Sequence, residues 1–176
     1  MKTHSIILHC IDTAQAYMLA REDSQLKKFA NRVHTLFFLA TPHRGSDYSQ
    51  FLANLLAISY GEKPYVAEIS RNSESIRLIN DSFSHCAAEL QLWSFYEQIP
   101  TRIAPFSTII VDVSSATLEF DHEVRLPLHA DHRGICKFQD KNDSNYKTLR
   151  EKFIITIDRI CSDSESYNLP QEYCAH

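Results

Sequence analysis

The sequence predicts an α/β fold with three layers, in which a mostly parallel sheet is flanked by helices. One observation is the stretch 33–47, VHTLFFLATPHRGSD, where the apolar run Leu36–Ala40 leads into a polar turn with a proline and a glycine. Short apolar runs that end in turn residues are typical of strands buried on both faces. A second observation is that such runs alternate with amphipathic segments, which indicates helices packed on a parallel sheet.

The elements follow from periodicity and from turn signals along the chain. Apolar residues at helical spacing predict helices over about 11–21, 48–59, 63–70, 74–89 and 145–160, with a break near Asp23 and a short second turn up to Asn31. Apolar and aromatic runs predict strands over 35–40, 90–96 and 107–113. Residues 118–140 are expected to form an irregular loop. We expect one domain over 1–161 and a polar, flexible tail over 162–176.

The composition of the chain argues against several classes of function. The chain has 176 residues and a net charge of -4, which suits one core and argues against a nucleic-acid partner. No apolar run is long enough for a transmembrane segment, and the run at residues 6–8 is too short for a secretory signal. Five scattered cysteines indicate reduced thiols in a cytoplasmic-type compartment, so neither a metal site nor another cofactor is expected.

Candidate chemistry lies where the predicted strands end. His43 and Arg44 follow the first strand, Asp112 ends the third, and Asp131 and His132 precede the last helix. In parallel sheets, sites gather at the carboxyl ends of strands. An acid followed by a histidine in a later loop matches the second half of the hydrolase order serine, acid, histidine. In that chemistry an imidazole takes the proton of a serine hydroxyl, and a carboxylate orients the imidazole.

Four segments resemble a known family. FFLATPHRGSD, LWSFYE, IIVDVSSATL and LHADHRGICKF are similar to the second half of the lipase-like α/β-hydrolase domain of serine-active-site-containing proteins, which are related to phospholipid-remodelling lipases. The similarity runs from about residue 11 to about residue 160. In fungi this domain often stands at the N-terminus of NACHT, ankyrin or TPR receptor-like proteins.

The resemblance implies roles for several residues. His132 stands at the position of the catalytic histidine, and Asp112 at that of the acid, because Ser114 in the neighbouring position has no carboxylate. His43, Arg44 and Asp131 are expected at the edge of the site. Purely structural roles are the alternatives. His132 would then be a loop histidine bonded to Asp131, and Asp112 a strand-end carboxylate that accepts backbone N–H groups.

The family also suggests a lipid or acyl-ester substrate, protein partners, and association with mitochondrial or endoplasmic-reticulum membranes. Its nucleophile elbow, GHS-x-GG, is absent here. The chain begins MKTHSIILHC, so Ser5 is only a weak candidate nucleophile, and no G-x-S-x-G occurs. We therefore expect an N-terminally truncated or degenerate serine hydrolase. The alternative is a catalytically dead interaction or signal-input module.

Overall fold

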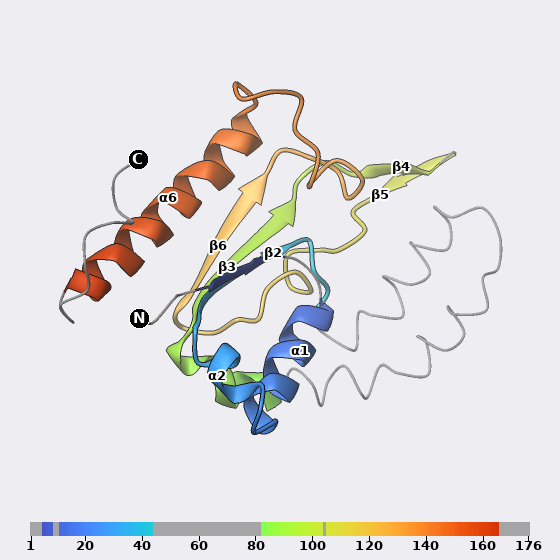
Figure 1. Ribbon diagram of the computed structural model, residues 1–176. Helices are drawn as coiled ribbons and strands as arrows, with labels where there is room; N and C mark the ends of the chain where they lie inside the picture. The colour runs from blue at the N-terminus through green and yellow to red at the C-terminus, as the bar shows by residue number, and fades with distance from the viewer. Residues whose placement is uncertain (1–4, 9–10, 44–81, 104, 166–176) are drawn as a thin grey trace.

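The computed structural model describes residues 5–8, 11–43, 82–103 and 105–165, and it has the α/β architecture that the sequence predicts (Figure 1). Its main sheet has four parallel strands in the order β1-β2-β3-β6, namely β1 (Ser5–Leu8), β2 (Val33–Leu39), β3 (Gln91–Glu97) and β6 (Glu123–Leu128). The described helices are α1 (Ile11–Glu22), α2 (Lys27–Ala30), the 3-10 turn η1 (Ala87–Glu89) and α6 (Ser144–Glu165). A separate antiparallel ribbon joins β4 (Thr101–Ile103) to β5 (Phe106–Thr108).

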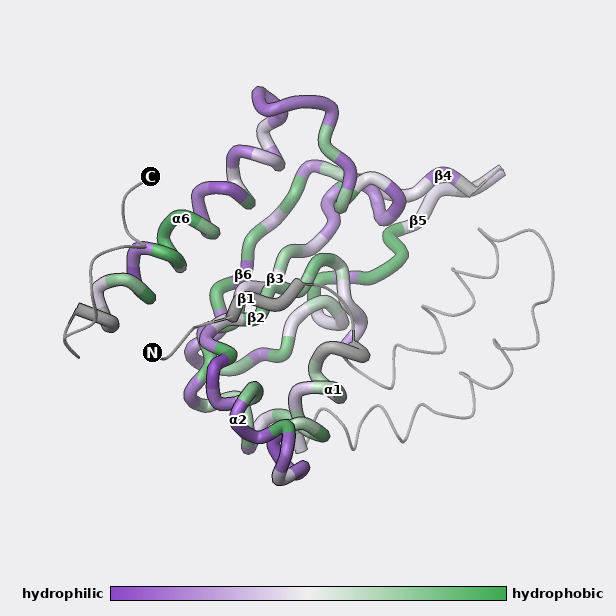
Figure 2. The backbone as a smooth tube through the Cα atoms, in the orientation of Figure 1, coloured by the Kyte–Doolittle hydropathy of each residue, from purple (hydrophilic) through white to green (hydrophobic). Residues whose placement is uncertain are grey.

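The sheet is buried on both faces because successive side chains of a strand point to opposite sides. Phe37 of β2 points into the core that α6 covers, where it stacks on Phe153 at a ring-centroid distance of 4.3 Å. Phe38 points into the core on the side of α1 and packs edge-on against Phe83. Figures 1 and 2 show α6 on one side of the strands, α1 and α2 on the other, and apolar residues concentrated in the strands between them.

Several predicted elements are confirmed. The strands over 35–40 and 90–96 are β2 and β3, and the helix over 11–21 with its break and short second turn is α1 followed by α2. The last helix is α6, which begins where expected and extends to Glu165, into the segment expected to be tail. The helices predicted over 48–59 and 63–70 lie outside the described residues. Of the helix predicted over 74–89, residues 82–86 are helical and lead into η1.

Two predictions are wrong in part. The segment 107–113 is not a strand of the main sheet: its first two residues belong to β5, which pairs with β4 in the antiparallel ribbon, and no described strand pairs with the buried Ile110 and Val111. The segment 118–140 is not wholly irregular, because it contains β6, which pairs with β3 along its whole length. Proline is unusual inside a strand, so Pro127 argued against predicting a strand here. It is tolerated because β6 is the edge strand among the described strands, and a proline at an edge need not donate to a ladder.

Candidate functional site

The carboxyl ends of β3 and β6 bring an acid and a histidine together. Glu97 is the last residue of β3 and pairs with Leu128, the last residue of β6, and His132 lies in the turn that follows. The Nδ1 atom of His132 is 3.8 Å from Oε2 of Glu97. This distance is within range of an ion pair and longer than a hydrogen bond. Such contacts are often loose in the absence of substrate and tighten when it binds.

Glu97 is held on one side only. Its side chain is completely buried, and the main-chain N–H of Val111 donates to Oε1 at 2.5 Å. Within the described part of the chain, Oε2 accepts no hydrogen bond, and it is this oxygen that faces His132. Burial raises the pKa of Glu97 to about 7, assisted by the negative charge of Asp131 and opposed by the N–H groups of Val111 and Ile110. The carboxyl group therefore changes its charge near neutral pH.

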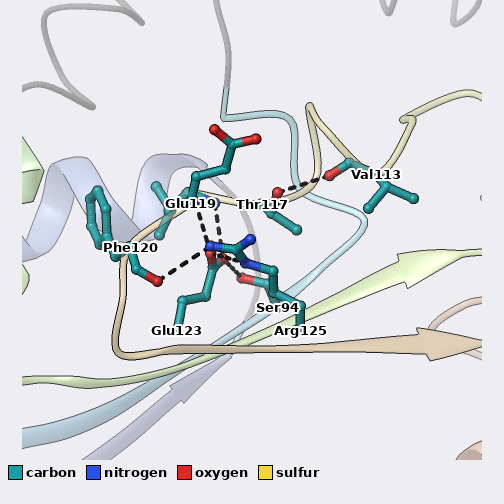
Figure 3. Close-up of polar contacts among 8 residues, drawn as sticks. Ser94, Val113, Thr117, Glu119, Phe120, Glu123 and Arg125 are labelled. Atoms are coloured by element: carbon teal, nitrogen blue, oxygen red, sulfur yellow. Dashed lines mark hydrogen bonds and ion pairs between the residues drawn. The ribbon is translucent and has the colours of Figure 1, made fainter.

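A second buried carboxylate, that of Glu123, accepts hydrogen bonds at both of its oxygens. Glu123 begins β6, and its oxygens accept hydrogen bonds from the main-chain N–H groups of Leu118 (2.9 Å) and Glu119 (2.8 Å). The hydroxyl of Ser94 and the guanidinium of Arg125, 2.9 Å away, complete the shell (Figure 3). All of these partners serve to fix the loop before β6 onto the sheet, so Glu123 is a structural anchor.

Asp112 lies in the turn after β5. It is exposed, and its Oδ1 accepts hydrogen bonds from the hydroxyl of Ser114 (2.6 Å) and the main-chain N–H of Ser115 (2.9 Å). This matches the structural alternative for Asp112, a carboxylate that accepts a backbone N–H group. The carboxylate facing His132 at the end of a sheet strand is that of Glu97.

Asp131 shapes the turn that carries His132. Its Oδ1 and its main-chain carbonyl oxygen both accept the N–H of Gly134, at 2.8 Å and 3.0 Å, and the carbonyl also accepts the N–H of Ile135. A Cβ atom at position 134 would lie 3.0 Å from Oδ1 of Asp131, so glycine allows this tight approach. Asp131 thus precedes His132 directly and caps the turn that carries it.

Ser5 begins β1, at the amino end of the sheet. The register pairs Leu8, at the other end of β1, with Phe37 and through it with Trp93, well before Glu97 along β3. The structure therefore does not bring Ser5 to the pair. Residues 9 and 10, which connect β1 to α1, lie outside the described residues.

His43 follows β2 and is 2% exposed. Its ring packs edge-on against Phe38 at 4.5 Å, its main-chain N–H donates to the carbonyl of Ser115, and its ring nitrogens have no hydrogen-bond partner among the described residues. Burial lowers the pKa of His43 to about 3, so the ring is neutral at physiological pH and serves as packing. Arg44 lies outside the described residues.

The described residues contain neither a cluster of metal-ligating side chains nor a membrane-spanning helix. Among them, no group of three or more histidine, cysteine, aspartate or glutamate side chains is placed to hold a metal ion. None of their helices combines the length and apolarity needed to cross a bilayer. Scans against protein-family models, curated proteins and solved structures gave no match for this chain.

The sequence pattern draws attention to His132 but not to Glu97. The strand predicted over 90–96 ends one residue before Glu97, so this carboxylate was not considered. A carboxylate that ends a mostly apolar and aromatic strand lies at the carboxyl edge of a parallel sheet, where sites gather.

Proposed function

We propose that this chain is a lipase- or esterase-like serine hydrolase of the α/β-hydrolase kind, acting on carboxylic acyl esters, among which phospholipids are one class. The observation that supports the proposal is the Glu97–His132 pair at the carboxyl ends of two neighbouring parallel strands. The order of this pair along the chain, acid before histidine, is the order that such hydrolases use. The similarity of the segments around these residues to the lipase-like family supports the same reaction class.

The chemistry follows from the geometry of the pair. His132 would act as general base through Nε2, because Nδ1 faces the carboxyl group. It would take the proton of a hydroxyl nucleophile as that oxygen attacks the ester carbonyl, and return the proton to the departing alkoxide. Glu97, when ionised, would hold the Nδ1 proton and stabilise the imidazolium that forms. Water would then hydrolyse the acyl-enzyme by the same route.

The proposal assigns the orienting acid to Glu97 and not to Asp112. The carboxylate of Asp112 is exposed and caps its own turn, whereas Oε2 of Glu97 is buried and faces the imidazole. An orienting acid must face Nδ1 of the imidazole when Nε2 is the nitrogen that takes and returns the proton. Glu97 meets this requirement.

Labelling by a fluorophosphonate probe tests the proposal, because this reagent reacts with activated serine hydroxyls. We expect the purified chain to label and His132→Ala to lose labelling. Glu97→Gln should slow it by about 100-fold or more, since Gln keeps the Val111 contact but cannot stabilise an imidazolium. Asp112→Asn, a matched change of the other candidate acid, should label at the native rate. Mass spectrometry of the labelled peptide, with Ser5→Ala alongside, identifies the nucleophile.

One observation favours a second function, a non-catalytic interaction or signal-input module. His4-Ser5 is the only His-Ser pair before α1, and it is the one that resembles the family's elbow. Ser5 begins β1 at the amino end of the sheet, away from His132. A chain that unfolds cooperatively but does not label would reject the hydrolase and support this alternative. Labelling that persists in His132→Ala would also reject the proposed mechanism.

A further inference from the structure

The loops that leave β3 and β6 are bonded directly to each other. The main-chain N–H of Gln98 donates to the carbonyl oxygens of Leu128 and Ala130, each at 3.2 Å, and that of Ile99 donates to Ala130 at 3.1 Å. Glu97 precedes the first of these donors, and His132 follows the last acceptor. The separation between the two functional side chains is therefore set by the contacts between these loops.

Thr101 provides a side-chain contact in this arrangement. It is the first residue of β4, is completely buried, and its hydroxyl oxygen accepts the main-chain N–H of His132 at 3.2 Å. Threonine is branched at Cβ, which restricts rotation of its side chain and fixes the direction of the hydroxyl. The hydroxyl of Thr101 thus holds the backbone of the histidine itself.

We propose that Thr101 is a positioning residue, whose hydroxyl fixes the main chain of His132 and thereby holds the imidazole within reach of Glu97. The catalytic significance of this contact rests on the proposed hydrolase function, whereas the contact itself does not. Without the hydroxyl, the N–H of His132 loses this acceptor, which weakens the attachment of the turn to β4. A shift of about 1 Å at a reacting group can lower a rate by about 100-fold.

Three variants separate the hydroxyl from the bulk of the side chain. Thr101→Val keeps the shape and removes the acceptor, whereas Thr101→Ser restores the acceptor. Thr156→Val is the matched control, because Thr156 is equally buried but its hydroxyl donates to the carbonyl of Lys152 within α6. Thr101→Cys, which keeps the bulk and is a weak acceptor, replaces Thr101→Val if that variant does not fold.

The first measurement is the imidazole ¹⁵N chemical shifts of His132 by NMR, assigned with His132→Gln, in each variant with and without Glu97→Gln. In the native chain the Glu97→Gln change should move these shifts, because it removes the facing carboxyl oxygen. In Thr101→Val this response should fall by at least half, and in Thr101→Ser and Thr156→Val it should remain native. Ester hydrolysis or probe labelling should fall by roughly 10-fold or more in Thr101→Val and recover in Thr101→Ser.

A native response in Thr101→Val, or an equal loss in Thr101→Ser or Thr156→Val, would overturn the role of Thr101. The NMR measurement requires no catalysis. A chain that never labels therefore rejects the hydrolase, while the response of His132 to Glu97→Gln still decides whether Thr101 positions the histidine.

Discussion

Glu97 and Glu123 are both buried carboxylates on neighbouring strands, but their surroundings differ. Glu123 accepts hydrogen bonds at both oxygens, whereas Glu97 accepts one at Oε1 and directs Oε2 at His132. Ionised Glu97 therefore lacks part of the solvation that an anion requires. Burial of this kind raises the pKa of Glu97 to about 7, so the charged form of Glu97 destabilises the folded state.

Glu97→Gln should change how stability depends on pH. The pKa of Glu97 rises from 4.5 to about 7 on folding, so between these values the folded chain holds a proton that the unfolded chain has released. Native stability therefore falls as pH rises through this window. Relative to the native chain, Glu97→Gln should gain about 2–3 kcal/mol of unfolding free energy across it. Urea unfolding near both ends of the window measures the gain, and parallel curves for the two chains would contradict it.

His43 should affect the pH dependence of stability in the direction opposite to Glu97. Its pKa falls from 6.5 to about 3 on folding, so below 6.5 the unfolded chain binds a proton that the folded chain excludes. Stability is therefore lost as pH falls. His43→Phe keeps the edge-on contact with Phe38 and should remove a loss of about 2 kcal/mol between about pH 7.5 and about pH 5. Urea midpoints measure this difference. The exposed His85→Gln is the control, and a His43→Phe curve as steep as the native one would refute the argument.

At the scale of elements, the sequence predicts those with strong and uninterrupted patterns. β2 and β3 contain mostly apolar and aromatic runs over 36–39 and 92–96, and the apolar stripe of α6 repeats at helical spacing. β6 was missed because only its first and last residues are buried and because it contains Pro127. β1 was missed because four residues are too few for a periodic signal. Both missed strands lie at the edges of the sheet, where fewer buried contacts constrain the sequence.

The same reasoning explains the candidate site. His132 was a candidate because the segment LHADHRGICKF around it resembles the lipase-like family. The resemblance suggested Asp112 as its acid, at the end of the strand predicted over 107–113, whereas pairing in that segment ends at Thr108. Once β6 is recognised as the neighbour of β3, the acid that precedes the histidine loop is Glu97. The observed strand order therefore favours a different candidate acid from the one that the sequence suggested.

The loop before β6 depends on Glu123. Its carboxylate joins the main chain of Leu118 and Glu119 to Ser94 on β3 (Figure 3). Glu123→Gln replaces one acceptor oxygen by an amide donor, which opposes an N–H or guanidinium donor in a buried site. We expect a loss of about 2–4 kcal/mol of unfolding free energy.

Urea unfolding at one pH measures this loss. Glu151→Gln is the matched control, because that side chain is 64% exposed and pairs only with its neighbour Lys152 among the described residues, so the change should cost less than about 0.5 kcal/mol. Equal costs for the two variants would mean that Glu123 does not anchor the loop.

At the scale of the whole molecule, β2 contributes to both cores. Phe37 lies in the core under α6 and Phe38 in the core under α1, so loss of either core would expose the same strand. Trp93 is the only tryptophan and is buried in the core under α6, which makes its fluorescence a local probe of that side. The shared strand predicts that the two cores unfold together.

Phe38→Leu tests this coupling from the face opposite the probe. The substitution removes ring contacts with Phe83 and should lower the unfolding free energy by about 1–3 kcal/mol. If the described fold is one cooperative unit, the transitions seen by Trp93 fluorescence and by far-UV circular dichroism should shift to lower urea by the same amount. Phe37→Leu, on the side of the probe, is the matched comparison and should behave identically. A circular-dichroism transition that shifts while the fluorescence transition stays in place would show that the two faces of the sheet unfold separately.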